Sequence, residues 1–447
     1  MKTRRERRKT AVVSGQSVSG MVASAILAHS GYNVLAIDRR AHLSRGIQWA
    51  GRQSFIDQLS TLSPHLAERF LGKCGAIYRG SIRVHTDGRR EVKSKPFPRI
   101  GNPRALPRSA HEMLDEPACF LISAGEVERL LRGYLYSLPN VSLHLGKSVE
   151  IRGPSKNGRH FLAGGDEPDL IVIAEGANSA SRLQLGIEAV QTSTQRLQVA
   201  GQAFGWDDGS MIKQRRLCGD DVLETGTLAQ RGRGCTWVVG DVGLYPVAHR
   251  PATWFRWSAT SRDVRLGFAL MVAQAIGQPV QKVLEHGVWG PGNFDVYPRT
   301  FQLQQHLVRR AVAGSNVILM GDAVGNGHWN EGGGMQIGAI CHAERLRQLL
   351  RSTDSTGRPD VEVLEQYSEG VVDDTRDWGE RGITSFYPMH GSADVVDVYR
   401  RSVAEYRAGI LGSPAAALTR ILMTRNLASH HEPRSVDRIP TKSGSLL

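Results

Sequence analysis

TAVVSGQSVSGMVASAILAHSGYNVLAID, residues 10–38, is the stretch that decides the fold of this chain. Its first five residues predict a short buried strand, the small residues of 18–30 predict a helix, and 33–38 predict a second strand. A strand, a helix and a second strand within about thirty residues form the unit from which parallel sheets are built. The sequence therefore predicts an α/β protein.

The turn between the first strand and the helix is rich in small residues. Gly15 and Gly20 stand where a G-x-G-x-x-G turn has its first and last glycine, for a tight turn and for close packing of helix and strand. The middle glycine, which lets a pyrophosphate approach the backbone, is replaced by Ser17. Asp38 ends the second strand, at the spacing of a carboxylate that binds adenosine ribose hydroxyls. The pattern predicts dinucleotide binding without a 2′-phosphate in this pocket.

Composition excludes several other classes of protein. The 447 residues carry a net charge of +13, scattered along the chain except at MKTRRERRKT, whereas a nucleic-acid binder clusters its charge. Five cysteines without a close pair predict neither a disulfide framework nor a metal site, and favour a cytoplasmic protein. The basic start resembles a signal peptide, but polar residues interrupt the apolar stretch that follows. The sequence has no run of 18 apolar residues, so no integral membrane segment is predicted.

Two further motifs lie far along the chain. In DLIVIAEGANSASR, residues 169–182, an apolar strand breaks into a turn. In NVILMGDAVGNGHWNEGGGMQIG, residues 316–338, another apolar run ends in a glycine cluster before a helix. The first is similar to the A-D-G-x-x-S-x-x-R motif of FAD-dependent aromatic hydroxylases of the p-hydroxybenzoate hydroxylase type, with Glu175 for the aspartate. The second resembles the G-D and G-x-G-x-N-x-G flavin motif of the same family.

The resemblance implies FAD as cofactor. Asp322 would bind the ribitol, and the amides of residues 333–336 would face the isoalloxazine ring at a helix N-terminus. Arg45 would reach the adenosine or the phosphates. The cofactor-binding candidates are Gly15, Gln16, Ser17, Val18, Ser19, Gly20, Asp38, Arg39, Arg45, Val149, Glu175, Gly176, Asp322, Gly332, Gly333, Gly334, Met335 and Gln336.

Two further positions depart from the family pattern. Trp329 replaces the proline before the glycine cluster, and Ala124 stands where relatives carry arginine or glutamine toward the flavin. Because the stretch should lie over the flavin, His328 and Trp329 are the catalytic candidates; a histidine can act as acid or base near neutral pH. Loop structure and packing are the alternative roles for both. His342, on the following helix, is predicted to be a buried structural residue.

The predicted architecture is a Rossmann-like FAD-binding domain with an inserted mixed β-sheet substrate domain and C-terminal helices. The FAD domain would use residues 8–75, 105–185 and 300–350, and the substrate domain 76–104 and 186–299. Residues 351–430 would form a helical region, and its basic amphipathic helices at about 396–426 would pack on the FAD domain, with a membrane surface or a second subunit as the alternative contact. Residues 431–447 resemble a flexible tail.

The implied function is a monooxygenase of secondary metabolism that inserts one oxygen atom of O₂ into a mid-sized aromatic or polycyclic compound through a C4a-hydroperoxyflavin. NADH or NADPH would reduce the flavin directly or through a separate flavin reductase. The protein would be a monomer or homodimer. Two alternatives stay open: a FAD-dependent reductase or cyclase of the geranylgeranyl reductase type, and a non-catalytic flavoprotein.

Overall fold

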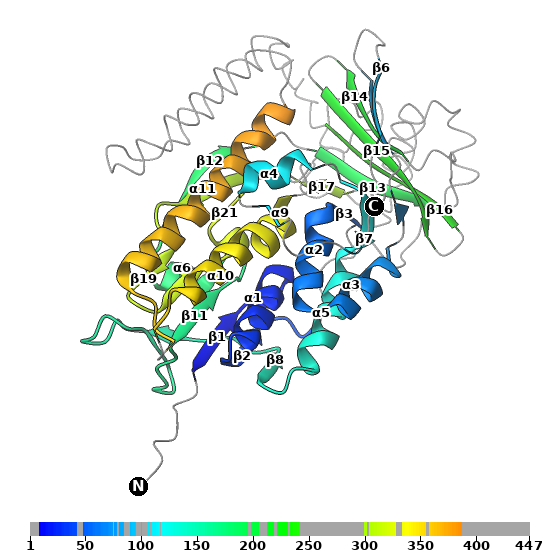
Figure 1. Ribbon diagram of the computed structural model, residues 1–447. Coiled ribbons are helices and arrows are strands. Elements are labelled where there is room, and N and C mark those ends of the chain that lie inside the picture. Colours follow the sequence, from blue (N-terminus) through cyan, green and yellow to red (C-terminus); the bar gives the residue numbers. More distant parts are fainter. Residues whose placement is uncertain are drawn as a thin grey trace, which may run out of the picture.

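The structure is a computed structural model of the chain (Figure 1). It describes residues 9–42, 48–74, 76–77, 80–84, 90–94, 100, 106–107, 109–116, 118–194, 198–204, 212–218, 221–230, 233–241, 299–301, 304–327, 333–354 and 357–386. Within these ranges, no helix combines the length and the apolar character needed to cross a membrane.

A sheet of parallel strands forms the centre of the fold. Its order is β19-β20-β11-β1-β2-β8, and every neighbouring pair is parallel except β19 with β20. The strands are β1 Thr10–Ser14, β2 Asn33–Asp38, β8 Val141–Leu145, β11 Leu170–Ile173, β19 Val312–Ala313 and β20 Val317–Leu319. The α/β class with a parallel sheet, predicted from residues 10–38, is confirmed.

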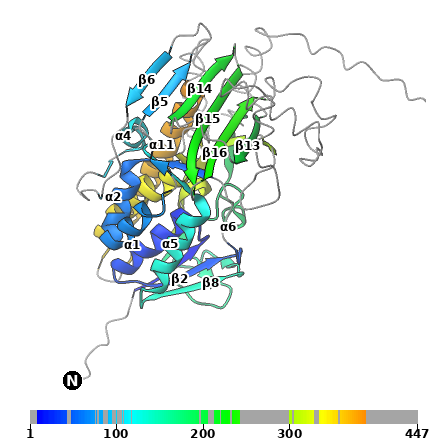
Figure 2. The ribbon, with the colours of Figure 1, turned by 90° about the vertical axis from the view of Figure 1, so that its right-hand side faces the viewer.

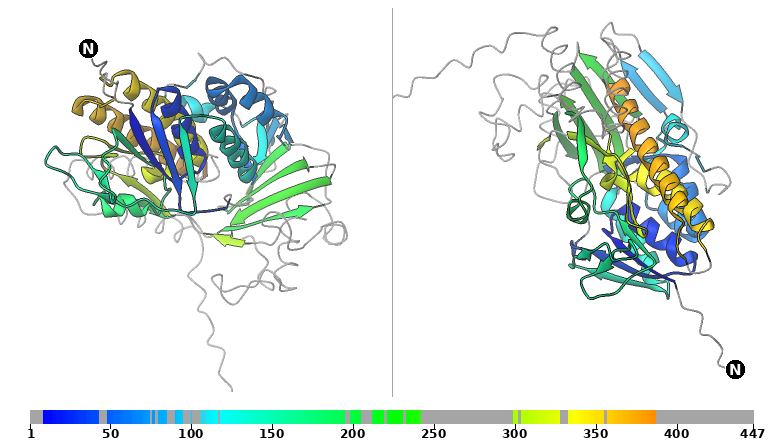
Figure 3. Two further views of the ribbon diagram at one scale, coloured as in Figure 1. Left: turned by 90° about the horizontal axis from the view of Figure 1, so that it is seen from below. Right: turned by 90° about the vertical axis from the view of Figure 1, so that its left-hand side faces the viewer.

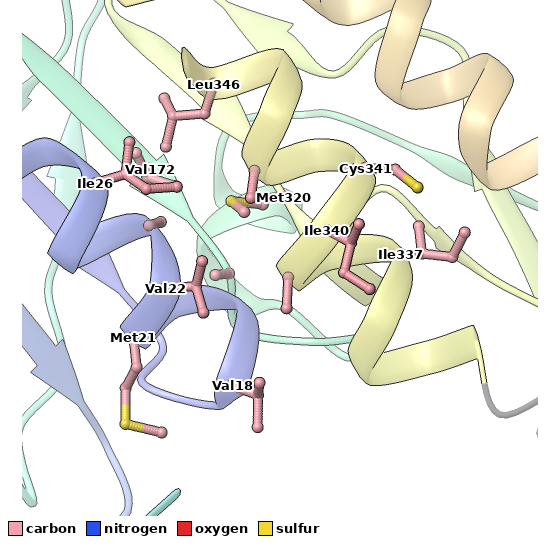
Figure 4. Close-up of a cluster of buried hydrophobic side chains, with 14 of the residues drawn as sticks. Val18, Met21, Val22, Ile26, Val172, Met320, Ile337, Ile340, Cys341 and Leu346 are labelled. Carbon is pink, nitrogen blue, oxygen red and sulfur yellow. The ribbon is translucent and has the colours of Figure 1, made fainter. Parts of the chain in front are cut away.

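Helices pack on one face of this sheet. Helix α1, Val18–His29, lies between α5, Ala124–Tyr136, and α10, Ala343–Arg351 (Figures 1 and 3). Residues 18–28 of α1 are all buried, as expected for a helix that is apolar on every side. Figure 4 shows side chains of α1, β11 and the segment 337–346 gathered into one buried cluster. The small residues of α1 therefore allow it to pack tightly against both the sheet and its neighbouring helices.

A second, larger sheet lies apart from the parallel one (Figure 2). It is mixed, because β14 pairs with β5 in parallel and the other pairs are antiparallel. In order, its strands are β17 Arg299–Phe301, β13 Gln198–Phe204, β16 Arg233–Asp241, β15 Asp221–Gln230, β14 Ile212–Cys218, β5 Gly80–Val84 and β6 Arg90–Ser94. The two chain segments predicted to form a substrate domain thus meet in one sheet; the substrate role and the domain boundaries stay predictions.

Smaller elements connect the two sheets. Strand β12, Ala189–Thr194, pairs with β18, Gln304–Val308, which pairs with β21, Gly325–Asn326. The remaining strands are β3 Gln48–Gly51, β4 Ala76–Ile77, β7 Phe120–Ser123, β9 Ile151–Arg152 and β10 Phe161–Leu162. The remaining short helices are α2 Gln53–Leu62, α3 Pro64–Leu71, α4 Ala110–Asp115, α6 Ala180–Gln184 and α9 Gly333–Gln336.

Helix α11, Val361–Phe386, is the longest described helix. It packs beside α10 and the segment Ile337–His342, which follows the third motif (Figure 3). It contacts α10, α4, β18 and β21. Tyr367 donates a hydrogen bond to the carbonyl of Leu319 at 2.8 Å, and the amide of Ala311 donates to Ser368. In the described part of the C-terminal region, the helix packs on the domain that carries the third motif.

Candidate functional site

A cavity of about 840 Å³ opens at the carboxyl ends of β1, β2, β11 and β20. Doubly wound sheets bind ligands at this edge, because the loops after neighbouring parallel strands meet there. The volume is within the range of pockets for small molecules and cofactors. The three sequence motifs, which lie between residues 15 and 335, all contribute to this one cavity.

Most cofactor-binding candidates line the cavity. They are Gly15, Ser17, Val18, Ser19, Asp38, Arg39, Val149, Glu175, Gly176, Asp322, Gly334 and Met335. Gln16, Gly20 and Gln336 are buried behind the wall, and Gly333 is the first residue of α9. The structure brings together residues that lie more than 300 positions apart in the sequence. Their contacts with a cofactor stay predictions.

The first motif forms a tight turn against β11. Gly15 has φ +93°, and a Cβ atom there would lie 2.4 Å from the carbonyl oxygen of Ala174. A Cβ atom on Gly20 would lie 1.8 Å from the carbonyl oxygen of Gly15. Only glycine fits at either position. The N-terminus of α1, with Ser17 as N-cap and no acidic residue in the first turn, borders the cavity and favours an anionic group there.

Asp38 is held by the chain itself. Its carboxylate accepts hydrogen bonds from the amides of Gln16 and Arg40, both at 2.7 Å, and from the Arg40 guanidinium at 3.1 and 3.2 Å. Burial alone would raise the pKa of Asp38, but these hydrogen bonds outweigh it and hold the pKa below its usual value. Asp38 is therefore ionised at neutral pH, and Arg40 lies beside it at the cavity wall.

Glu175 is surrounded by serines. Its carboxylate accepts hydrogen bonds from the hydroxyls of Ser14, Ser179 and Ser181 at 2.5, 2.8 and 2.5 Å, and from the Ser181 amide at 3.0 Å. Burial favours a higher pKa, but the four donors lower it below the usual value. The glutamate that replaces the family aspartate thus ties the end of β1 to the turn after β11.

Among the described residues, Asp322 is an acidic group of the cavity with no hydrogen-bond partner at its buried oxygen. It follows β20 in a turn of 3₁₀ helix, Gly321–Ala323, and its Oδ1 atom is buried without a hydrogen bond. The side chain lies partly open on the cavity side, and burial on its other sides raises its pKa to about 7. An unpaired buried acceptor is costly, so this site is suited to a ligand that donates hydrogen bonds, such as a ribityl hydroxyl.

The ring of Trp378 packs close to two glycines that line the cavity, Gly327 and Gly334. A Cβ atom on Gly334 would lie 3.5 Å from the ring of Trp378, and one on Gly327 would lie 2.5 Å from the same ring. Trp378 comes from α11, lines the cavity and is buried. Sequence reasoning missed Trp378, because its position within a long amphipathic helix gives no signal of a partner more than forty residues away. Trp49 of β3 is a second lining aromatic that was not predicted.

Arg45, His328, Trp329 and Gly332 lie outside the described residues. Ala124, the position that differs from the family, does line the cavity.

His342 is buried and structural, as predicted. It ends a turn of π-helix, Ile337–His342, and its Nδ1 atom accepts a hydrogen bond from the Gly321 amide at 2.9 Å. Its Nε2 atom lies 3.1 Å from the hydroxyl of Thr375. Burial lowers the pKa of His342 to about 3, so the ring is neutral at physiological pH.

Acidification is expected to destabilise the protein through His342. The unfolded chain protonates this residue below pH 6.5, whereas the folded chain does so only near pH 3. The free energy of unfolding should therefore fall by up to about 1.4 kcal/mol per pH unit below 6.5 from this residue. Urea unfolding between pH 7 and 5 measures the slope, and His342→Gln should have a shallower one. Equal slopes in both proteins would contradict the prediction.

Comparison with solved structures identifies the fold. A mutant of 2-methyl-3-hydroxypyridine-5-carboxylic acid oxygenase matches with a TM-score of 0.60 and 14% identity, over 92% of this chain and 100% of that one. HpxO of Klebsiella pneumoniae, complexed with FAD and uric acid, matches at 0.59 and 17%, over 96% and 99%. PqsL of Pseudomonas aeruginosa, a probable FAD-dependent monooxygenase, matches at 0.61 and 14%, over 89% and 99%.

No protein-family model and no curated protein sequence matches the chain. At 14–17% identity, the likeness to the solved structures concerns the fold. The likeness extends over nearly the whole length of each of these three proteins, and so it includes more than the parallel sheet and its helices. The chain therefore has the fold shared by a pyridinecarboxylic acid oxygenase, the FAD-complexed HpxO and the probable FAD-dependent monooxygenase PqsL.

Proposed function

We propose that the chain binds FAD and acts as a flavin-dependent monooxygenase on a mid-sized aromatic or polycyclic compound. The observation that carries this proposal is the convergence of three flavin-type motifs on one cavity at the carboxyl ends of the parallel strands. The shared fold with FAD-complexed HpxO and with PqsL supports the same conclusion.

Each part of FAD has a matching group in the cavity. The N-terminus of α1 and the hydroxyl of Ser17 would bind the pyrophosphate, because helix N-termini favour anions. Asp38 would accept hydrogen bonds from the adenosine ribose, in exchange for part of its pairing with Arg40. Asp322, with its unpaired buried oxygen, would accept from the ribityl chain. The helical segment that begins at Gly333 would present its first amides to the flavin ring.

The reaction uses one oxygen atom of O₂ for the substrate and reduces the other to water with two electrons from NADH or NADPH, directly or through a separate reductase. When bound, FAD supplies the electron-transfer and oxygen chemistry. The residues of this chain would bind the cofactor, orient the substrate beside it and exclude water. Trp49, Trp378 and Met335 give the cavity apolar surface for this purpose. The uric acid in the HpxO complex and the hydroxypyridine carboxylic acid in the name of the oxygenase are both cyclic compounds, which supports a cyclic substrate.

Purified protein is expected to be yellow, or to become so on addition of FAD, with flavin absorption bands retained after gel filtration. Anaerobic titration with NADH and with NADPH should then bleach these bands, and admission of air should restore them. If neither nucleotide bleaches the bands, addition of a flavin reductase together with the nucleotide should do so. Absence of any FAD uptake would contradict the proposal at its first step.

The behaviour of the reduced protein separates the alternative functions. A reduced protein that is inert to oxygen but saturates a polyprenyl double bond would be a reductase of the geranylgeranyl reductase type. A protein that binds FAD but is not reduced by NADH, NADPH or a reductase would be a non-catalytic flavoprotein. A monooxygenase reoxidises in air and releases either peroxide or a hydroxylated product.

A further inference from the structure

Helix α11 contacts the turn around Asp322 from behind the cavity. Tyr367 bonds the carbonyl of Leu319, three residues before Asp322, and Trp378 lies against Gly327, five residues after it. Between these two contacts, Thr375 of α11 reaches His342, which bonds the amide of Gly321. Helix α11, which belongs to none of the three motifs, is thus connected to the turn around Asp322 before it, after it and at Gly321.

The hydrogen bonds among these groups have one consistent direction. The Thr375 hydroxyl donates to the carbonyl of Val371 at 2.7 Å, so its oxygen is left as an acceptor for His342. The Nδ1 atom of His342 accepts from the Gly321 amide, so the proton of the neutral ring is on Nε2. His342 and Thr375 are 0% and 2% exposed, so water does not compete for these bonds. The Gly321 amide, which can only donate, therefore fixes the tautomer, and the Thr375 oxygen lies where it can accept the Nε2 proton of that tautomer.

The backbone at Gly321 needs such support. Gly321 has φ +64°, in the left-handed region, and glycine has many accessible conformations there. A Cβ atom on Gly338, in the π-helix, would lie 2.9 Å from the Cα atom of Gly321, so the two segments are in close contact. The π-helix brings His342 onto the Gly321 amide, and turns of π-helix frequently occur at functional sites. His342 thus bonds the amide of Gly321, the residue immediately before Asp322.

We propose that His342 and Thr375 are positioning residues that fix Asp322 for the ribityl chain of FAD, and that α11 is thereby part of the cofactor site. The inference rests on the proposed FAD binding. It assigns a function to two residues that touch neither the cavity nor the cofactor.

The test compares three variants by fluorescence titration with FAD. Thr375→Val removes the hydroxyl that lies beside Nε2 of His342 but keeps the methyl group that lies beside Gly325, and should weaken FAD binding about fivefold to tenfold. Thr375→Ser keeps the hydroxyl and should bind FAD as the wild type does. Ser368→Ala, on the same helix, removes a buried bond to Ala311 and should lower the melting temperature without changing FAD affinity. Equal loss of FAD affinity in Thr375→Val and Ser368→Ala would overturn the proposal.

A double-mutant cycle tests whether the effect passes through Asp322. In an Asp322→Asn background, Thr375→Val should cause no further loss of FAD affinity, since the carboxylate that it positions is already absent. A fully additive loss would show that Thr375 acts elsewhere and would overturn the proposal.

Amide hydrogen exchange gives a readout that needs no cofactor. The Gly321 amide should exchange faster in Thr375→Val than in wild type or Ser368→Ala, measured in the cofactor-free protein. Unchanged exchange in Thr375→Val would overturn the connection from α11 to the turn. Faster exchange in a protein that does not take up FAD would instead uphold the connection while the proposed function fails.

Discussion

Replacement of Gly20 by alanine is expected to destabilise the protein by about 3 kcal/mol or more, because the added Cβ atom would lie 1.8 Å from the carbonyl oxygen of Gly15. The obstructing atom belongs to the backbone of the first motif and cannot rotate away. Helix α1 would have to move off β1, and the N-terminus that borders the cavity would move with it. Urea unfolding measures the stability, and FAD titration of the remaining folded protein should show weakened binding.

Gly133→Ala is the matched control. Gly133 also lies inside a helix, α5, but a Cβ atom there meets nothing within 4 Å and the residue is exposed. Alanine should stabilise this position by about 0.5–1 kcal/mol, since glycine is the poorer helix former. The two substitutions are chemically identical and should have opposite signs. A Gly20→Ala protein as stable as the wild type would contradict the close crossing of α1 and β1.

Asp322→Ala is expected to weaken FAD binding about 10-fold to 100-fold, the effect of removing hydrogen bonds to a charged group. Its Oδ1 atom has no partner among the residues that the structure describes, so the substitution breaks no hydrogen bond of that atom there. The cofactor-free variant should accordingly be at least as stable as the wild type. Fluorescence titration gives the affinity and urea unfolding gives the stability.

The FAD affinity of the wild type should depend on pH through the same residue. The pKa of Asp322 is about 7 before binding, and hydrogen bonds from the ribityl chain would lower it. Binding then releases a proton below pH 7, so affinity should rise by up to tenfold per pH unit as the pH approaches 7, and level off above it. Asp322→Asn cannot ionise and should remove this dependence.

Asp374→Asn is the control for this titration. Asp374 is also a buried carboxylate whose pKa is raised by burial, but it bonds Ala110 and Arg345, and it does not line the cavity. Its substitution should lower stability and leave the pH dependence of FAD affinity intact. Loss of the dependence in both variants would assign it to a group other than Asp322.

Local patterns carried much of the prediction. The strands 10–14 and 33–38 have the predicted bounds, and the helix predicted at 18–30 ends one residue earlier. These elements follow from residues close together in sequence: alternation, small residues and turn-forming glycines. The positions of Asp38, Glu175 and Asp322 at the carboxyl ends of their strands follow in the same way, because a strand pattern shows where the strand ends.

Partners distant in the sequence were not predicted in the same way. No pattern in the sequence indicates that Glu175 accepts a hydrogen bond from the hydroxyl of Ser14, far away at the end of β1, or that the ring of Trp378 lies against Gly327. Such contacts depend on how elements pack, and a side chain in a helix has many neighbours of similar polarity to choose from. Gly327 illustrates the difference, because its sequence context suggests a turn, whereas in the structure the bulky ring of Trp378 occupies the space that a side chain would need.

The sequence by itself determined the parallel-sheet class, the three motifs and the acidic residues that end their strands, since each depends on a few neighbouring residues. The tertiary structure alone decided which of these acids is left without a partner. Asp38 and Glu175 accept hydrogen bonds from donors of the chain, whereas the buried Oδ1 atom of Asp322 has no partner among the described residues. The amide of Gly321, the residue before Asp322, donates to His342, and His342 in turn contacts Thr375 of α11. The physical reason is that hydrogen-bond satisfaction in a buried site depends on every element around it, and these elements come from the whole length of the chain.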